Sequence, residues 1–382
     1  MTTILIAPNA FKGSLTADQA IDAMEAGTRE ACEECRIISK AIADGGDGFA
    51  QVIGDEPGTE TVSVDVHDPL GRPIEASCSY NAGNSTAMID VASACGLSLL
   101  EESEYDPLTA SSYGVGELIR QVLDLNISRL IIGIGGTATN DAGMGMAAAL
   151  GARFLDMAGE EISRPSGIDL GGISRVDMAE FEPRLADITV EALCDVDNPL
   201  LGENGAARVY APQKGASKEV VERLETGMQH FVTLLSLDLG FKHTHAEGMG
   251  AGGGLAAGLS AFLNASLRKG IDMVMEQLNI PEALDAADLV ITTEGRLDNQ
   301  TLLHGKAPAG IASEARAINV PCIAIAGEVE TGADSRYQDI FTSVFSLCPG
   351  PVSRDDAMQN AAAYLQHATR QAVSLFLAGK NT

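Results

Sequence analysis

TTILIAPNAFKGSLTADQ, residues 2–19, carries the local signals that decide the fold of this chain. Thr3–Ala7 is a short apolar run that ends at a proline, which is typical of a buried strand. Thr16 and Gln19 have the spacing of a capping box, and apolar side chains follow at helical intervals. The sequence therefore opens with a strand, a connecting loop and a helix, the first unit of a parallel α/β sheet.

The same alternation of apolar runs and helix-period segments continues after this helix and returns near the C-terminus. It predicts strands at Arg36–Ile42, Asp288–Thr293, Pro321–Ala326 and Phe341–Leu347, a helix at Ala309–Ile318 and an amphipathic C-terminal helix. Because both ends follow one pattern, we expect them to form a single Rossmann-like, doubly wound parallel sheet.

The middle of the chain follows a different pattern. Thr61 to Ala82 alternates apolar and polar residues around the turn signal Asp68-Pro69-Leu70-Gly71, which predicts an antiparallel hairpin. Buried strands are expected at Leu130–Ile134 and Ile188–Leu193. We therefore predict an α/β protein in which residues 1–60 and 284–382 form the Rossmann-like domain. A second, mixed α/β domain is inserted at 61–283, and an active site is expected in the interdomain cleft.

Composition excludes several classes of function. The 382 residues include 25 Lys plus Arg and 53 Asp plus Glu, so the formal net charge is −28. Such a charge repels nucleic acids and anionic membranes. The N-terminus lacks a basic segment before its apolar run, and no stretch is apolar enough to span a bilayer, so we expect a cytoplasmic protein.

Seven cysteines are scattered along the chain. Their odd number and wide spacing make a disulfide framework improbable and suit a reducing compartment. Cys32 and Cys35 form an isolated CxxC pair where a helix is expected to meet a strand. We interpret both as structural thiols rather than as metal ligands or redox groups.

The few lysines lie beside glycines. Lys12, Lys214, Lys269 and Lys306 each adjoin a Gly in an otherwise acidic chain. Glycine lets backbone amides and an ammonium approach the same anion. We predict anion binding at Lys12 and Lys306 and an ordinary surface position for Lys269.

Chemistry-bearing segments follow three strands of the Rossmann-like domain: APNAFKGS at 7–14, ADGGDG at 43–48 and TEGRLDNQ at 293–300. Parallel strands present their carboxyl ends at one edge of the sheet, where such sheets bind ligands. These segments and a nearby lysine supply cations for phosphate or carboxylate oxygens, and carboxylates for Mg²⁺ or proton transfer. The cations are Lys12, Arg296 and Lys306, and the carboxylates are Asp44, Asp47, Glu294 and Asp298. Turn capping is the alternative for Asp44 and Asp298.

The inserted domain offers a glycine-rich loop after the strand Leu130–Ile134. Its sequence, GIGGTATNDAGMG at 133–145, could hold phosphates with glycine amides and with the amino end of the following helix. Gly133, Gly135 and Ala138 also match the dinucleotide fingerprint, but no acidic residue about 20 positions further on suits the ribose role. The adjacent Met144 and Met146 are interpreted as packing residues.

Asp195 and Asp197 follow the strand Ile188–Leu193 and precede an Asn-Pro turn. A carboxylate at this position could serve as a general base, as a metal ligand or as a cap of the turn. Motifs of P-loop and protein kinases, zinc proteases and serine hydrolases are absent from the sequence.

Seven motifs in order along the chain resemble those of the type I bacterial glycerate kinases. They are APNAFKGSLTA, ADGGDG, GIGGTATNDAGMGMA, CDVDNPL, APQKGA, GMGAGGGLAAG and EGRLDNQ followed by GKAP. The resemblance covers essentially the whole chain. It implies ATP-dependent phosphorylation of D-glycerate, generally to 2-phosphoglycerate, by a Rossmann-like domain with an inserted α/β domain.

The sequence departs from the family pattern in places. Ala142 stands where the family commonly has Gly, Asp47 replaces a Glu, and the stretch from Arg296 to Lys306 is one residue longer than expected.

With ATP and Mg²⁺ as the expected cofactors, we assign hypothetical roles for phosphoryl transfer. Lys12 and Lys306 neutralise the transferring phosphate, and Arg296 grips the glycerate carboxylate. Asp195 orients or deprotonates the attacking hydroxyl, while Asp44 and Asp298 hold Mg²⁺. The loop residues that bind the nucleotide phosphates are Gly133, Gly135, Gly136, Thr137 and Asn140.

Alternatives stay open at this point. The substrate could be another small hydroxy acid such as tartronate or erythronate, and the 3-hydroxyl could be the acceptor. Remoter alternatives are an NAD-dependent hydroxy-acid dehydrogenase and a non-catalytic binding protein. The sequence also leaves a homo-oligomer open.

Overall fold

The computed structural model describes all residues except 12, 43–57, 244–245, 298–306, 331–336 and 381–382. Contacts divide the chain into two compact units, Met1–Asp44 with Ile271–Thr382 and Gly45–Gly270. We refer to these as unit 1 and unit 2. The sequence placed the corresponding boundaries near residues 60 and 284.

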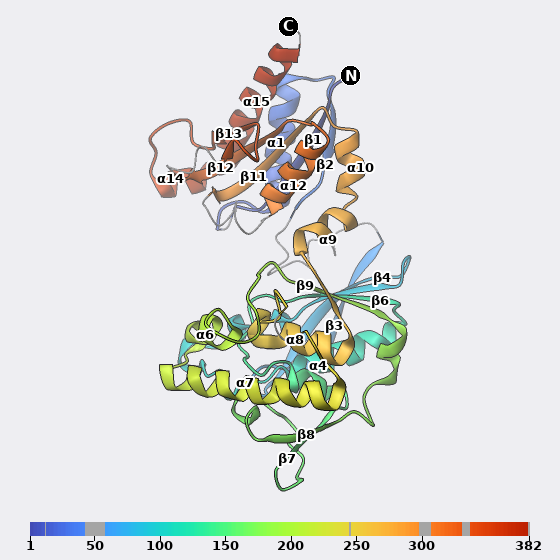
Figure 1. Ribbon diagram of the computed structural model, residues 1–382. Helices are drawn as coiled ribbons and strands as arrows, with labels where there is room; N and C mark the ends of the chain where they lie inside the picture. The colour runs from blue at the N-terminus through green and yellow to red at the C-terminus, as the bar shows by residue number, and fades with distance from the viewer. Residues whose placement is uncertain (12, 43–57, 244–245, 298–306, 331–336, 381–382) are drawn as a thin grey trace. The chain divides into compact units, whose positions relative to one another are not determined.

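Unit 1 is an α/β unit with a five-stranded sheet in the order β13-β12-β11-β1-β2, in which every pair is parallel. The chain moves from β1 outward to β2 and later returns to the other side of β1 as β11, so strand order reverses between β1 and β11 (Figure 1). This reversal is the position where doubly wound sheets bind ligands. Its elements are β1 (Thr3–Pro8), α1 (Ala17–Ala31), β2 (Arg36–Ser39), α9 (Gly270–Gln277), α10 (Ile280–Asp285), β11 (Leu289–Leu297), α12 (Ala307–Ala317), β12 (Cys322–Val329), β13 (Ser343–Ser346), α14 (Arg354–Gln359) and α15 (Ala361–Lys380). The first residue of α9, Gly270, is the last residue of unit 2.

The local signals at the N-terminus are confirmed. β1 is buried along its whole length, and α1 begins after Thr16, whose side chain and that of Gln19 form the expected capping box. α1 lies beside the C-terminal helix α15 (Figure 1). They approach so closely that a Cβ at Gly27 would lie 2.2 Å from the carbonyl oxygen of Gln366. The two chain ends therefore share one core, as the repeated pattern predicts.

Unit 2 contains a six-stranded mixed sheet in the order β10-β9-β6-β5-β4-β3 and a separate two-stranded sheet, β7-β8. The β3–β4 hairpin is antiparallel and turns at Asp68–Gly71, as predicted, whereas β5, β6, β9 and β10 run parallel. The strands are β3 (Thr59–His67), β4 (Pro73–Asn81), β5 (Thr86–Asp90), β6 (Arg129–Gly133), β7 (Arg153–Asp156), β8 (Ile173–Asp177), β9 (Thr189–Leu193) and β10 (Ser266–Arg268).

Helices and short 3₁₀ turns cover this sheet. The α-helices are α3 (Ala92–Cys95), α4 (Tyr113–Val122), α5 (Met144–Ala149), α6 (Ala206–Tyr210), α7 (Lys218–Leu239) and α8 (Leu255–Leu263). The 3₁₀ turns are η1 (Leu97–Leu99), η2 (Glu102–Glu104), η3 (Leu123–Leu125), η4 (Gly167–Asp169), η5 (Pro183–Asp187), η6 (Pro212–Lys214) and η7 (Ala251–Gly254). Met144 and Met146 are fully buried, so their interpretation as packing residues is confirmed.

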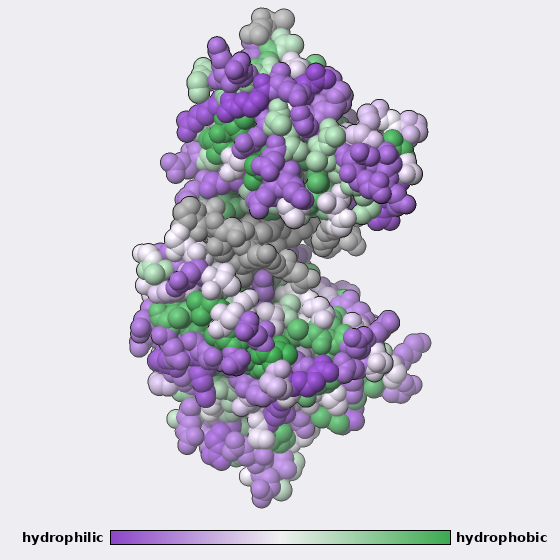
Figure 2. Space-filling view, turned by 180° about the vertical axis from the view of Figure 1, so that it is seen from behind, coloured by the Kyte–Doolittle hydropathy of each residue, from purple (hydrophilic) through white to green (hydrophobic). Residues whose placement is uncertain are grey.

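The surface agrees with the acidic composition. On the side of the molecule shown in Figure 2, hydrophilic residues cover much of each unit, and in unit 2 hydrophobic residues gather in a band that hydrophilic residues border. Among the helices that the structure describes, none has the length and apolarity needed to cross a bilayer.

The CxxC pair differs from the prediction. Cys32 and Cys35 are joined by a disulfide, so their interpretation as two structural thiols is wrong in this structure. Cys32 caps the C-terminal end of α1 and Cys35 directly precedes β2, which brings their Cα atoms to 5.4 Å. The guanidinium of Arg29 donates to the carbonyl oxygens of Glu33 and Cys35 and closes the same turn. The other five cysteines are free thiols.

Candidate active site

The candidate site in unit 2 lies where its parallel strands end. Asp90 at the end of β5 is in register with Gly133 at the end of β6, and Gly133 is in register with Leu193 at the end of β9. A Cβ on Gly133 would lie 2.5 Å from Oδ1 of Asp90, so only glycine lets the loop leave β6 beside this carboxylate. Asp195 follows two residues after Leu193. One sheet edge therefore collects two carboxylates and the start of the glycine-rich loop.

The loop after β6 is held by short, strand-like pairing. The amide of Leu97 donates to the carbonyl of Gly136, and the amide of Ala138 donates to the carbonyl of Cys95, each at 2.8 Å. Gly135 is partly exposed, and Gly136 is exposed with a φ of 62°. Within the described residues, the backbone amides of Gly135 and Gly136 donate to no acceptor. The loop thus presents two adjacent amides at its surface, an arrangement suited to an anion.

A second glycine-rich segment, η7, packs against the inner side of the loop after β6. A Cβ on Gly253 would lie 2.0 Å from the carbonyl oxygen of Thr139, and one on Gly252 would lie 2.6 Å from the Ile134 side chain. Both glycines have positive φ, at 69° and 62°. Because these positions are glycines, the backbone of the motif GMGAGGGLAAG can pack in direct contact with the loop backbone.

Lys214 lies under the loop, with only 2% of its surface exposed. Its ammonium donates to the Thr137 hydroxyl at 3.1 Å and to the Thr139 carbonyl at 2.6 Å. Burial lowers the pKa of Lys214 to about 8, opposed by the charges of Cys95 and Asp141. The sequence marked Lys214 as a glycine-flanked lysine but assigned it no role.

Asp141 occupies the amino end of α5. Its carboxylate accepts hydrogen bonds from the Ser112 amide and hydroxyl and from the amides of Gly143 and Gly145. The Ser112 hydroxyl in turn accepts from the amide of Met146 at 2.9 Å. The expectation that this helix end receives substrate phosphate is therefore wrong, because an internal carboxylate and a hydroxyl already occupy its first amides.

Two predicted binding residues face inward. Thr137 is 4% exposed and Asn140 is fully buried. The Asn140 amide donates to the carbonyl of Ala206 at 3.3 Å, and its Oδ1 has no hydrogen-bond partner among the described residues. In this structure both side chains contribute to the interior of the loop, and their contact with a nucleotide stays a prediction.

The candidate base lies at the end of β9. Oδ1 of Asp195 accepts a hydrogen bond from the amide of Gly270 at 2.7 Å. Asp195 is partly exposed and Asp197 is exposed. Asp195 is thus positioned at the strand edge that also carries Asp90 and Gly133.

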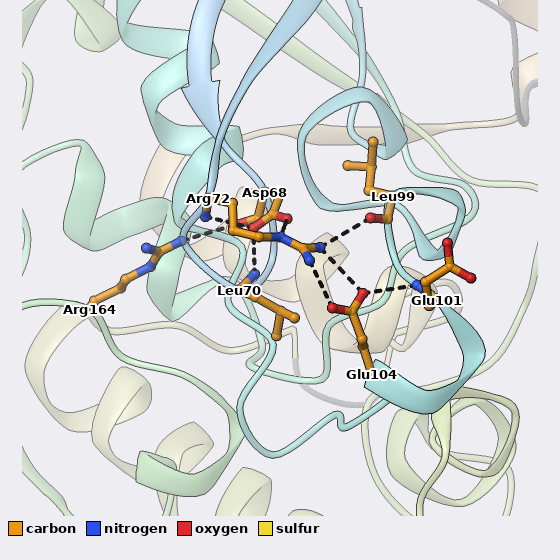
Figure 3. Close-up of polar contacts among 7 residues, drawn as sticks. All are labelled: Asp68, Leu70, Arg72, Leu99, Glu101, Glu104 and Arg164. Atoms are coloured by element: carbon orange, nitrogen blue, oxygen red, sulfur yellow. Dashed lines mark hydrogen bonds and ion pairs between the residues drawn. The ribbon is translucent and has the colours of Figure 1, made fainter.

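A buried aspartate fixes the segment that pairs with the loop (Figure 3). Asp68 is 1% exposed and accepts from the amides of Leu70 and Arg72 at 2.9 Å and from Nε of Arg72 at 2.5 Å. Burial raises the pKa of Asp68, but these hydrogen bonds outweigh burial and hold the pKa below its usual range. The same guanidinium reaches the Leu99 carbonyl at 3.3 Å and the Glu104 carboxylate at 2.8 Å. The hairpin turn is thereby tied to η1 and η2, next to the loop partner Leu97.

In unit 1, candidate residues lie at the ends of β1 and β11, on the two sides of the strand-order reversal. The side-chain amide of Asn9 lies 3.4 Å from the carboxylate of Glu294, and the Thr293 hydroxyl donates to the Asn9 carbonyl at 2.7 Å. The sequence expected the strand to end at Thr293, but β11 continues to Leu297. Arg296 is therefore a strand residue, paired in register with Glu328, whose carboxylate lies 3.7 Å from Nε of Arg296.

Several predicted site residues lie outside the described part of the chain. They are the cations Lys12 and Lys306 and the carboxylates Asp44, Asp47 and Asp298. Among the described residues, no group of three or more His, Cys, Asp or Glu is arranged to hold a metal ion. The assigned phosphate and Mg²⁺ roles of these residues stay predictions.

Comparisons with known proteins agree with the motifs. The Glycerate kinase family matches residues 4–377. Curated relatives include a glycerate kinase from Halalkalibacterium halodurans, 42% identical over 97% of each chain, and one from Bacillus subtilis, 41% identical over 98% of each chain. A glycerate 2-kinase from Escherichia coli is 38% identical over 98% of each chain.

A solved structure shows the same fold. It is a crystal structure from Salmonella typhimurium LT2, assigned as glycerate kinase 2, which is 38% identical and covers 100% of both chains with a TM-score of 0.89. Sequence motifs, curated relatives and fold therefore agree, and we conclude that this chain belongs to the glycerate kinase family.

Proposed function

We propose that this protein transfers the γ-phosphoryl group of ATP to the 2-hydroxyl of D-glycerate. Membership of the glycerate kinase family over residues 4–377 is the observation that carries the proposal. The 2-hydroxyl is chosen because the resemblance implies this product and because a relative with 38% identity is a glycerate 2-kinase.

The loop after β6 is the proposed phosphate-binding element. The amides of Gly135 and Gly136 have no acceptor among the described residues, and these two glycines are the partly exposed and exposed residues of the loop segment 133–140. Phosphoryl transfer needs positioning and charge neutralisation more than covalent chemistry, so fixed amides beside bound phosphates can supply part of the stabilisation. Gly133 starts the loop, and Thr137 and Asn140 maintain its inner face.

Asp195 is the proposed group that orients or deprotonates the attacking hydroxyl. Its bond to the Gly270 amide fixes the carboxylate at the end of β9, on the sheet edge where the glycine-rich loop begins. Lys12 and Lys306 are proposed to neutralise the transferring phosphate, and Arg296 to bind the substrate carboxylate.

Mg²⁺, which would supply charge neutralisation of the nucleotide phosphates, is proposed to be held by Asp44 and Asp298.

The role of Asp195 is tested by a matched pair of variants. Asp195→Asn retains an oxygen that can accept from Gly270 but cannot take a proton, and we expect kcat to fall about 10²–10⁴-fold. Asp197→Asn changes an exposed neighbour and should retain kcat within about threefold. Near-normal kcat in a folded Asp195→Asn protein would assign the base to another residue.

The reaction itself is tested by incubation with ATP, Mg²⁺ and D-glycerate, followed by proton-coupled ³¹P NMR. Phosphorus on the 2-hydroxyl couples to a single carbon-bound proton and gives a doublet. Phosphorus on the 3-hydroxyl couples to a methylene group and gives a triplet. A panel with tartronate and erythronate separates kinases of other hydroxy acids, and nicotinamide reduction without ADP release would indicate a dehydrogenase.

A further inference from the structure

We propose that Lys214 is a positioning residue that holds the loop after β6 in the conformation that binds the anionic substrate. The inference rests on the proposed function, because it assumes that this loop receives phosphate. Lys214 itself reaches the loop from its inner side and is not assigned any contact with substrate.

The contacts of Lys214 are concentrated on the loop. The ammonium donates both to the Thr137 hydroxyl and to the Thr139 carbonyl, so it contacts the loop on either side of Ala138. These bonds bridge 77 and 75 residues of sequence, so they fix a long-range arrangement rather than a local turn. Gly135 and Gly136, whose amides donate to no acceptor among the described residues, come immediately before this segment.

The backbone that carries Lys214 is closely packed. It ends η6, and the following Gly215 has a φ of 92°. A Cβ on Gly215 would lie 2.4 Å from the Tyr105 carbonyl oxygen. The close approach of η6 to Tyr105 fixes the backbone position from which the Lys214 side chain reaches the loop.

The charge on Lys214 is what points to an anion. Among the described residues, no carboxylate lies within ion-pair distance of its ammonium, which donates to two neutral oxygens, the Thr137 hydroxyl and the Thr139 carbonyl. The carboxylate of Asp141 is close enough to raise the pKa of Lys214, but the Asp141 oxygens accept hydrogen bonds from Ser112, Gly143 and Gly145. A buried charge without a direct counterion costs free energy, which an anion bound on the outer side of the loop would offset.

A neutral side chain could fill the same volume at lower cost. Replacement of buried charged groups by packed apolar residues is often neutral or stabilising. A role in packing alone therefore does not explain a fully buried ammonium at this position. A role that combines positioning of the loop backbone with attraction of an anion explains it.

The test compares Lys214→Met and Lys214→Gln with Lys218→Met, which removes an exposed lysine from the start of α7. We expect kcat/KM for ATP with D-glycerate to fall about 10²-fold in Lys214→Met, since small misplacements of binding groups have effects of this size. Lys214→Gln, which retains an N–H donor, should recover part of the loss. Lys218→Met should match the wild type.

Amide hydrogen exchange supplies a readout that does not depend on turnover. In Lys214→Met, the amides of Leu97 and Ala138, whose hydrogen bonds hold the loop in the wild type, should exchange faster while α7 keeps wild-type protection. Wild-type kinetics and exchange in a folded Lys214→Met protein would overturn the inference and leave the proposed function standing. If the wild type itself forms no phosphoglycerate, the proposed function fails and the inference fails with it. Failure of both Lys214 variants to fold would assign the residue to general stability instead.

Discussion

Oδ2 of Asp141 accepts hydrogen bonds from both the amide and the hydroxyl of Ser112, each at 2.8 Å. Both residues are fully buried, and they connect the start of α4 to the loop and to α5. Burial raises the pKa of Asp141, and its hydrogen bonds counteract that rise. The loop is thus fixed at its C-terminal end by Asp141, as it is fixed in its middle by Lys214.

We expect Asp141→Asn to lower the free energy of unfolding by about 2–4 kcal/mol. The substitution replaces one carboxylate oxygen with an NH₂ group, which cannot accept the hydrogen bonds that Ser112, Gly143 and Gly145 donate to Asp141. Urea denaturation measures the change. Asp124→Asn is the control: Asp124 is 70% exposed and pairs with Arg184 at 2.7 Å, an exposed ion pair worth at most about 1 kcal/mol. Equal stability of the two variants would show that Asp141 does not anchor the loop.

Contact between η7 and the loop is tested by two glycines with nearly the same backbone conformation. Gly253 and Gly240 have φ of 69° and 70°, but a Cβ on Gly253 would meet the Thr139 carbonyl at 2.0 Å, whereas one on Gly240 meets nothing within 4 Å. Gly240→Ala should therefore cost only about 1–2 kcal/mol, the cost of a left-handed alanine.

Gly253→Ala should cost about 3 kcal/mol or more and also reduce activity, since the displaced carbonyl is an acceptor for Lys214. Urea midpoints and kcat/KM of both variants check this. The proposed support of the loop by η7 fails if the two substitutions prove equivalent.

Stability should depend on pH through Lys214. Burial lowers the pKa of this group to about 8 from an ordinary value of 10.5, so the unfolded chain binds more protons than the native protein between these pH values. The contribution of Lys214 to the free energy of unfolding therefore rises as pH increases through this window. Cys95 and Asp141 are the titratable groups whose charges oppose the shift.

The measurement is the difference in unfolding free energy between wild type and Lys214→Met, followed from about pH 7 to about pH 10. Subtraction of the variant removes contributions from other titrating groups. We expect the difference to shift in favour of the wild type as pH rises. A difference that stays constant would contradict a buried, charged Lys214.

Thiol counting tests the Cys32–Cys35 disulfide. The chain contains seven cysteines, and two of them are joined, so the denatured protein should show five reactive thiols before reduction and seven afterwards. The bond closes a very short loop, so its loss should lower stability by about 2 kcal/mol at most in the chain-entropy account. Seven reactive thiols in protein kept free of reductant would contradict the bond.

Much of the fold could be predicted because local signals agreed with tertiary structure. The capping box at Thr16 starts α1 where expected, and the turn at Asp68–Gly71 joins two antiparallel strands. Periodicity located strand interiors well but not all strand ends. β11 continues past Thr293 because β12 beside it supplies hydrogen-bond partners as far as Val329, and a single sequence does not show that pairing.

The candidate site was only partly predictable. Glycine spacing identified the loop after β6, but the supports of that loop depend on contacts across long sequence separations. Lys214 meets Thr137 from 77 residues away, and Asp141 meets Ser112 from 29. For the same reason the sequence could not show that the Asp141 carboxylate and the Ser112 hydroxyl accept hydrogen bonds from the amides at the start of α5. The sequence signals for Lys214 were the adjacent glycine and its place in the motif APQKGA, and neither indicated its contacts with the loop.

Phosphate binding by the loop is tested most directly by ¹⁵N–¹H NMR of glycine-labelled protein during titration with ATP and Mg²⁺. We expect saturable shifts of the Gly135 and Gly136 amides in the wild type, with weaker saturation in Lys214→Met than in Lys218→Met. Unchanged resonances of both amides in a protein that turns over ATP and D-glycerate would contradict it.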